Sequence, residues 1–226
     1  MELIDLSTEF RDGMPKPPSG PRVDMRYVLI PSEEEEKSRG FTNKMEQFTI
    51  TTHVATHIDA PAHFSFHGKT IDEYPLDFFY MVPTIMLEIK KEVYGAVTAE
   101  DIKCAEKVCG EIMEDDLVLL YTGACHRYEE AEYEKSPYLT EEAAKYLTKK
   151  RVRMVGIDSF TVDDPRKKKK PAHVELLCRN AVPIIECVMN LDKIPMYRFH
   201  TICMPLKVKE GSGAFTRMAA VIEERY

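Results

Sequence analysis

Tryptophan is absent from this 226-residue chain, and its six cysteines include no C-x-x-C pair. The cysteines are scattered beyond residue 100, at Cys104, Cys109, Cys125, Cys178, Cys187 and Cys203. Paired thiolates of the kind that close a structural zinc site are therefore missing. An even number of cysteines permits disulfides, but a chain of this length without a secretory signal favours reduced thiols.

Net positive charge is also lacking, because the formal net charge is −7. Nucleic acids and anionic membranes need a basic surface for affinity, so neither is expected as a partner. The one strong basic cluster, Arg166–Lys170, is local and is more typical of a solvated loop than of a phosphate site.

Long apolar segments are missing as well. No apolar run approaches the roughly 20 residues that a membrane span needs. The opening residues Met1–Asp5 are partly acidic and lack the basic start and apolar core of a signal peptide. We therefore expect a cytoplasmic protein.

What the chain does contain is a mixture of short apolar strands and a few helices, over a length that suits one domain covering residues 1–226. Thr98 and Thr140 are good N-caps for helices over Ala99–Val108 and Glu141–Lys149, and Pro171 suits the start of a third over Ala172–Asn180. The β-branched and aliphatic runs predict strands at Tyr27–Ile30, Gln47–Thr52, Thr84–Ile89, Leu117–Tyr121, Val152–Ile157, Val182–Val188, Thr201–Lys207 and Ala219–Glu223. This order predicts an α/β domain with a mixed sheet, in which the proline-rich residues 15–21 form a rigid rim loop.

The candidate chemistry is concentrated in the segment HVATHIDAPAH, residues 53–63. It contains His53, His57, Asp59 and His63, and imidazole and carboxylate are the ligands of zinc and manganese in sites open to substrate. These four positions differ by even numbers, so an extended chain would point them to one side. A helix would turn Asp59 away, and Pro61 opposes a helix. The spacing predicts a strand that runs into a loop beside one cavity.

The alternative is an ordinary half-buried strand with polar side chains. Three histidines and an aspartate on one face would then need several separate hydrogen-bond partners to offset their desolvation. A second patch favours the metal interpretation. His173 lies near the start of the third helix, and Glu186 lies inside the apolar run Val182–Val188, where a carboxylate is costly unless it meets a cation.

At these residues the chain resembles a known family. Residues 53–63 resemble the H-x-G-T-H-x-D-x-P-x-H motif of the cyclase family, which includes bacterial kynurenine formamidases (arylformamidases) and isatin hydrolases. Ala55 stands where the motif has glycine. Further segments match family features in order along the chain: Leu3–Ser7, Asp12–Pro15, Gly156–Asp158, Asp163–Pro165, His173 with Leu176 and Leu177, Ile184–Glu186, and Met204–Lys207.

The resemblance implies roles for single residues. His53, His57 and Asp59 would bind a first metal ion, with Asp59 bridging to a second ion held by His173 and bridged again by Glu186. His63 resembles the family's acid/base histidine. The implied fold is the swivelling β/β/α type, the implied cofactors are two divalent ions, zinc or alternatively manganese, and the implied assembly is a homodimer or larger homo-oligomer.

The implied activity is hydrolysis of a carbon–nitrogen amide bond in a small molecule, most like that of an arylformamidase, which converts N-formylkynurenine to kynurenine and formate. Two alternatives remain open: hydrolysis of another small amide or cyclic imide, as in isatin hydrolases, or metal binding without catalysis. Isatin hydrolases carry an amide where this chain has Glu186, which favours the formamidase type. A structural metal site would need closing protein ligands, and no thiolate lies near the motif to supply one.

The chain departs from the kynurenine formamidases at two positions. Those enzymes typically place a tryptophan in the early loop, where it can stack on the aryl ring, and Pro17 stands there in this chain. Ala55 adds a methyl group where the backbone would approach the metal ions. Neither residue is a ligand, so both bear on substrate preference and local geometry instead of on the metal site.

Overall fold

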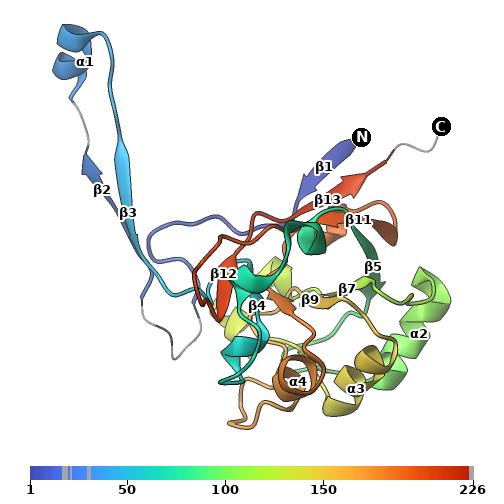
Figure 1. Ribbon diagram of the computed structural model, residues 1–226. Coiled ribbons are helices and arrows are strands. Elements are labelled where there is room, and N and C mark those ends of the chain that lie inside the picture. Colours follow the sequence, from blue (N-terminus) through green and yellow to red (C-terminus); the bar gives the residue numbers. More distant parts are fainter. Residues whose placement is uncertain (17–19, 21, 30–31, 224–226) are drawn as a thin grey trace.

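The centre of the protein is a mixed nine-stranded sheet in the computed structural model, which describes residues 1–16, 20, 22–29 and 32–223. Its strands lie in the order β1 (Glu2–Asp5), β13 (Ala219–Ile222), β11 (Arg198–Ile202), β5 (Val82–Glu88), β7 (Leu117–Tyr121), β9 (Met154–Ile157), β10 (Ile184–Glu186), β4 (His57–Asp59) and β12 (Gly213–Phe215). The neighbours β5, β7, β9 and β10 are parallel, and the strands outside them are antiparallel. The predicted α/β class with a mixed sheet is confirmed (Figure 1).

Helices α2 (Ala99–Cys109), α3 (Glu141–Lys149) and α4 (Pro171–His173) pack against one side of this sheet (Figure 1). Thr98 forms a capping box with Asp101, and the Thr140 side chain accepts from the N–H of Ala143, as the sequence predicts. The third helix differs from the expectation. It is α-helical for three residues only and continues as a π-helix over Val174–Arg179.

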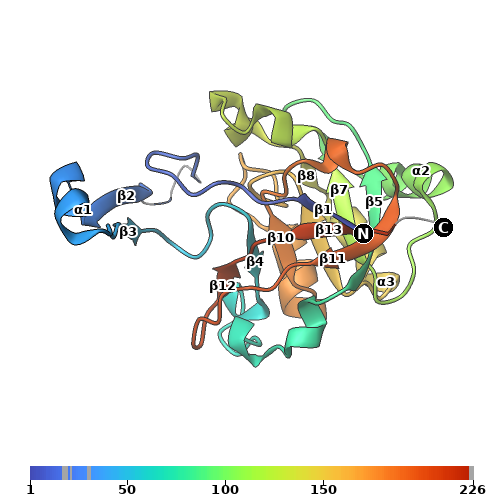
Figure 2. The same ribbon diagram turned by 90° about the horizontal axis from the view of Figure 1, so that it is seen from above.

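Both faces of the sheet are buried, which explains its near-continuous apolar strands. In β7, Val118 and Leu120 contact the core under the helices, whereas Leu117 and Leu119 contact a second core on the opposite face. That second core joins strands from both ends of the sheet, so the sheet curls around it (Figure 2). Strands β6 (Ala96–Val97) and β8 (Tyr138–Leu139) form a separate two-stranded parallel sheet.

Several predicted strand bounds are wrong. The strand predicted at Thr201–Lys207 is β11, which begins at Arg198 and ends at Ile202. It ends there because its partners β5 and β13 pair only with residues 198–202, and Pro205 makes a single isolated bridge to Thr216. The strand predicted at Val182–Val188 is also shorter, since β10 covers Ile184–Glu186.

Residues 24–29 and 32–49 form an arm that projects from the body (Figures 1 and 2). It consists of the antiparallel strands β2 (Asp24–Leu29) and β3 (Met45–Thr49) with helix α1 (Glu33–Arg39) at the tip. The predicted strands at Tyr27–Ile30 and Gln47–Thr52 belong to this hairpin, although Ile30 lies outside the described residues and the ladder ends at Thr49. Helix α1 was not predicted; Ser32 and Glu35 form its capping box and Gly40 ends it in the left-handed conformation.

No helix among the described residues is long and apolar enough to cross a membrane. The proline-rich rim predicted for residues 15–21 lies partly outside the described part of the chain, as does Pro17.

Candidate metal centre

Strand β4 is the structural basis of the site, because it lies between β10 and β12. Its side chains alternate, so Ile58 enters the second core while His57 and Asp59 face the other way. The antiparallel register with β10 places Glu186 directly opposite His57, and directly opposed residues share a face. Pairing of strands that lie 129 positions apart in the sequence thus brings Glu186 to the motif.

The other two histidines of the motif arrive by turns. His53–Thr56 is not a strand, because Ala55 adopts the left-handed conformation with φ of 59°. His63 ends a short 3₁₀ helix, Pro61–His63. The prediction of one extended segment from His53 onward is therefore wrong, and only His57 and Asp59 share a strand face. The turns nevertheless bring His53 and His63 together, with their rings stacked at a centroid separation of 3.8 Å.

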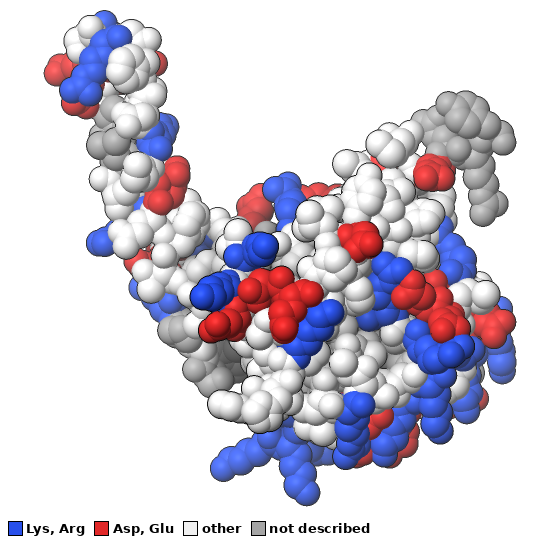
Figure 3. Space-filling view, in the orientation of Figure 1, with Lys and Arg blue, Asp and Glu red and all other residues white. Residues whose placement is uncertain are grey.

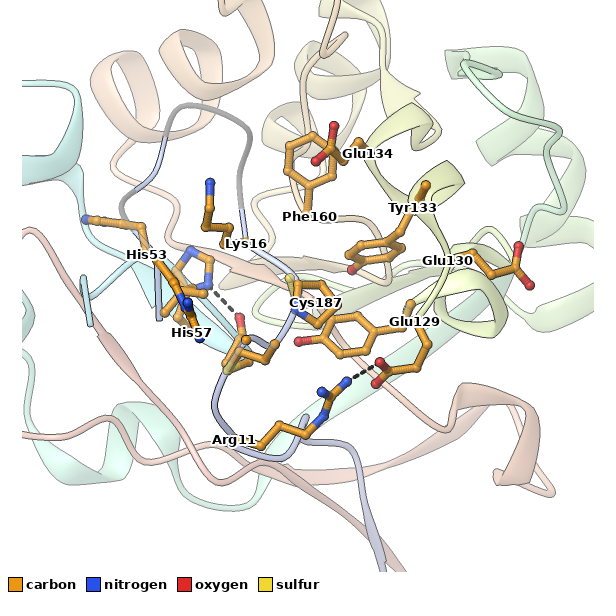
Figure 4. Close-up of a pocket in the computed structure, with 18 residues that line it drawn as sticks. Arg11, Lys16, His53, His57, Glu129, Glu130, Tyr133, Glu134, Phe160 and Cys187 are labelled. Carbon is orange, nitrogen blue, oxygen red and sulfur yellow. Dashed lines mark hydrogen bonds and ion pairs between the residues drawn. The ribbon is translucent and has the colours of Figure 1, made fainter. Parts of the chain in front are cut away.

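All six predicted site residues line one cavity of about 550 Å³, which we call the metal cavity. They are His53, His57, Asp59, His63, His173 and Glu186. An outer cavity of about 480 Å³ adjoins it and is lined by aromatic and charged side chains (Figure 4). The two cavities share His53, His57 and Phe160, so Phe160 is the aromatic side chain at their junction.

The candidate ligands form two overlapping groups that share Asp59. His53, His57 and Asp59 place ligand atoms within 4.8 Å of one another, and so do Asp59, His63 and His173. The two oxygens of Asp59 point to different histidines. Oδ1 lies 3.2 Å from His57 Nε2, and Oδ2 lies 3.5 Å from His173 Nε2.

Glu186 repeats this pattern. Its Oε2 lies 3.7 Å from His57 Nε2, and its Oε1 lies 3.4 Å from His173 Nε2. Both carboxylates therefore connect the same two histidines, one oxygen on each side. Carboxylates that bridge two cations in one site have this arrangement.

In His57 and His173, Nδ1 is bonded to a group outside the cavity, so Nε2 faces the two carboxylates. His57 Nδ1 donates to the carbonyl of Ala55 at 2.8 Å, and His173 Nδ1 lies 2.6 Å from Asp163 Oδ2. Nε2 of His57 and Oδ2 of Asp59 are buried without a hydrogen-bond partner. A buried imidazole lone pair and a buried carboxylate oxygen without partners fit a divalent cation in the space between them.

His53 is held on both sides. Its Nδ1 lies 2.6 Å from Asp59 Oδ1, and its Nε2 lies 2.8 Å from the Ser212 hydroxyl. Gly213 provides the room for this ring, because a Cβ at that position would lie 2.7 Å from His53 Cε1. Ser212 and Gly213 therefore position His53, and the sequence contained no signal that identified them.

The electrostatics of the cavity favour positive charge at the histidines. Burial lowers the pKa of His57, but the neighbouring Asp59 and Glu186 outweigh it and raise that pKa to about 9. Burial also lowers the pKa of His173. The carboxylates of Asp163, Asp59 and Glu186 outweigh this effect and raise that pKa well above its usual value. The same field accepts either a proton or a metal ion at these nitrogens.

The pKa values of Asp59 and His63 are both lowered, but for different reasons. Burial raises the pKa of Asp59, yet the surrounding His57, His173 and His53 hold it well below its usual range. Burial, reinforced by the neighbouring histidines, lowers the pKa of His63 to about 4. His63 is thus a neutral imidazole at neutral pH, whose lone pair can accept a proton or bind a metal ion.

Asp163 is a further residue at the candidate site that sequence reasoning did not single out. It is buried, and besides the His173 ring it accepts the backbone N–H groups of Ala172 and His173. One carboxylate therefore caps the first turn of α4 and orients the imidazole at its end. The only sequence signal was its place in the segment Asp163–Pro165, which resembles the family pattern.

Comparison with known proteins agrees with this geometry. The family model described as putative cyclase matches residues 4–164. A kynurenine formamidase of Geobacillus thermodenitrificans is 30% identical over 208 residues, which cover 88% of this chain and 93% of that protein. The chain is therefore similar in sequence to a formamidase over nearly its whole length.

Solved structures are similar over the same extent. Isatin hydrolase A from Ralstonia solanacearum gives a TM-score of 0.86 at 21% identity, with 98% of this chain and 92% of that chain covered. Isatin hydrolase A from Labrenzia aggregata gives a TM-score of 0.84 at 27% identity, with 98% and 94% covered. These likenesses confirm the predicted cyclase-type α/β fold.

A test of the positioning role uses Asp163→Asn. We expect the affinity for a divalent ion to fall by about 10- to 100-fold, because the amide orients His173 less firmly and no longer increases its basicity. Zinc competition with a chromophoric chelator would measure the change, and the exposed Asp192→Asn is the control. Unchanged zinc affinity in Asp163→Asn, with the fold intact by circular dichroism, would contradict the role.

The backbone at Ala55 gives a second prediction. A non-glycine residue in the left-handed region is strained, so Ala55→Gly should stabilise the protein by about 0.5–1 kcal/mol after the entropy cost of glycine. Urea unfolding would measure this stabilisation. Ala99→Gly in the first turn of α2 is the control and should be neutral or destabilising. Destabilisation by Ala55→Gly would show that the turn is not strained.

Proposed function

This chain belongs to the cyclase family, and from that premise we propose that it is a metal-dependent hydrolase that cleaves a carbon–nitrogen amide bond, with an arylformamidase-like preference. The observation that carries the proposal is the pair of buried carboxylates, Asp59 and Glu186, each of which joins His57 to His173. Such a pair suits two cations that act together on one small substrate.

We assign the cofactors as two divalent ions, zinc with manganese as the alternative. His53 and His57 would hold one ion and His173 the other, with Asp59 and Glu186 shared between them. The ions would supply Lewis-acid chemistry, which lowers the pKa of water towards about 7 and polarises a carbonyl oxygen. The nitrogen and oxygen donors of this set match the preferences of zinc in catalytic sites.

The chain's own residues divide the remaining work. The ring of His63 stacks on that of His53. His63 acts as the acid/base residue: it takes a proton from the attacking water and returns it to the nitrogen of the breaking C–N bond. For a formanilide, formate and an aryl amine then leave. Asp163 and Ser212 fix the rings of His173 and His53 during this exchange.

The outer cavity supports an aryl amide as the substrate class. Tyr128, Tyr133 and Phe160 supply aromatic walls, and Phe160 also lines the metal cavity, so a ring there would lie beside the reacting carbonyl. N-formylkynurenine, an intermediate of tryptophan catabolism, is an aryl amide of this class. A cyclic substrate of the isatin-hydrolase type is disfavoured by the carboxylate at Glu186, because isatin hydrolases carry an amide at that position. We further propose a cytoplasmic location and a homodimer or larger homo-oligomer.

The two-metal arrangement predicts that one bridge serves both ions. Purified protein should contain about two divalent ions per chain, and Asp59→Asn or Glu186→Gln should weaken both sites by more than about tenfold. Elemental analysis after dialysis against graded chelator would measure this, with the exposed Asp77→Asn as control. Full amidase activity in metal-free wild-type protein would end the metal-dependent interpretation.

Substitution of His63 separates chemistry from metal binding. His63→Ala should retain both ions and lose roughly 100- to 10,000-fold in turnover, because the proton carrier is gone. His53→Ala should lose metal as well. Metal content and turnover measured on the same samples decide between the roles. Equal metal loss in the two variants would make His63 a ligand, as its place in the second ligand group permits.

Substrate preference follows from position 17. Without a tryptophan there, the protein lacks a stacking contribution of about 0.5–1.5 kcal/mol, so we expect only modest kcat/KM for N-formylkynurenine. Kinetics on formanilides, alkyl formamides, cyclic imides and isatin would establish the preferred class. Phe160→Leu should raise KM for aryl substrates by up to about tenfold and leave alkyl formamides unchanged. Fast, tight hydrolysis of N-formylkynurenine would show that residue 17 is not limiting.

A further inference from the structure

The basic run Arg166–Lys170 divides into an exposed part and one residue that lines a cavity. Its first four side chains are exposed, as the sequence predicts for a solvated loop. Lys170, directly before α4, is half-buried and lines the metal cavity. Within the described part of the chain it is the only lysine or arginine on the wall of that cavity. A cation therefore borders the space in which a substrate would lie.

Lys170 has no partner among the described residues. Asp59 and Glu186, the two carboxylates on the cavity wall, lie against histidines. Asp164, in the same loop as Lys170, pairs with Arg166 through Oδ1 and Nε at 2.8 Å. Over residues 1–16, 20, 22–29 and 32–223, the Lys170 side chain makes no ion pair or hydrogen bond. Its three N–H donors are thus available to an anion that enters the cavity.

The rest of the wall suits an aryl ring. Phe64 and Phe160 line the same cavity as Lys170. The Phe64 ring stacks on the His173 imidazole at a centroid separation of 4.5 Å, and it still exposes 36% of its surface. Aromatic walls exclude water, so a charge pair beside them is screened less than a pair in open solvent. The cavity therefore combines an aromatic surface with one unpaired cation.

The surrounding charge also favours an anion, although the net charge of the chain is −7. Two divalent ions, as proposed above, would carry more positive charge than Asp59 and Glu186 neutralise. The space-filling view shows basic side chains projecting from the lower end of the body, where the loop before α4 lies (Figures 1 and 3). A local positive field at a cavity raises the concentration of anionic ligands there.

We propose that Lys170 binds a carboxylate on the amine part of the substrate, so that the preferred substrate is an aryl amide with an acidic group. The inference rests on the proposed function, because it specifies the substrate class of the same site. A carboxylate on the ring fits better than one on a long side chain, since Lys170 lines the metal cavity and does not line the outer cavity. A neutral aryl amide would leave the ammonium group without this partner.

Matched substrates test the charge preference. Formanilides with a carboxylate at the ortho, meta or para position would each be compared with the corresponding carboxamide, at about 0.15 M salt to screen exposed charges. Wild-type protein should favour at least one carboxylate by about tenfold in kcat/KM, because a charge-assisted hydrogen bond is gained. Lys170→Met should abolish this preference mainly through KM, and Lys170→Arg should restore most of it. Lys168→Met removes the same charge from the exposed part of the loop and should keep the preference.

Direct binding tests the same contact without hydrolysis. Isothermal titration calorimetry would compare the aminobenzoates, which are the amine products of these formanilides, with the neutral aminobenzamides. Lys170→Met should weaken aminobenzoate binding by about tenfold, with metal content at the wild-type value and aminobenzamide binding less affected. A carboxylate that binds only to the metal ions would bind this variant as tightly as the wild type, which would overturn the proposal.

The two proposals can fail separately. Hydrolysis without any preference for a carboxylate, or equal losses on carboxylates and carboxamides in Lys170→Met, would refute the role of Lys170 and leave the hydrolase assignment intact. Protein that hydrolyses none of these amides, but loses aminobenzoate binding in Lys170→Met and regains it in Lys170→Arg, would support the anion subsite and refute the proposed function.

Discussion

Two carboxylates buried among histidines are the constraint on which the site depends. Asp59 and Glu186 are both buried, and each connects His57 to His173. Removing two anions from water is costly unless cations accompany them. The surrounding imidazoles either take up protons, as the raised pKa values of His57 and His173 indicate, or donate lone pairs to metal ions. In both states the negative charge of the carboxylates attracts the positive charge at or between the imidazoles.

The fold fixes the direction in which the histidine and carboxylate side chains of the site point. Strand β4 is only three residues long, but pairing on both sides with β10 and β12 holds His57 and Asp59 on one face. The remaining ring nitrogens are occupied by a carbonyl, a carboxylate or a hydroxyl from Ala55, Asp163 and Ser212. Each of these three imidazoles, in His57, His173 and His53, therefore has one nitrogen bound to the protein scaffold, and its other nitrogen faces the carboxylates.

Chemistry and recognition occupy adjoining spaces. The metal cavity contains all of the candidate ligands, and the outer cavity contains aromatic and charged side chains suited to the rest of a small molecule. Phe160 lines both cavities, so it lies between the candidate ligands and the aromatic side chains of the outer cavity. The arm begins at the same rim, since Thr51 follows β3 closely and lines the metal cavity.

The sequence by itself determined the chemical identity of the site and the elements with strong local signals. The residues of the 53–63 motif, His173 and Glu186 were identified from residue type and pattern, and α2, α3 and β7 from caps and apolar runs. Helix α1 was missed although Ser32, Glu35 and Gly40 carry its signals, which are as local as those of α2.

Only the tertiary structure decided how these residues meet. The left-handed turn at Ala55, the position of Glu186 opposite His57, and the contacts of Asp163 and Ser212 depend on strand register and packing between distant segments. Local patterns report the preferences of neighbouring residues, whereas register is selected by burial of the whole sheet on both faces. The alternation rule therefore predicted one shared cavity from an extended geometry that holds only for His57–Asp59. Turns bring His53 and His63 into that cavity, and long-range strand pairing brings Glu186 there.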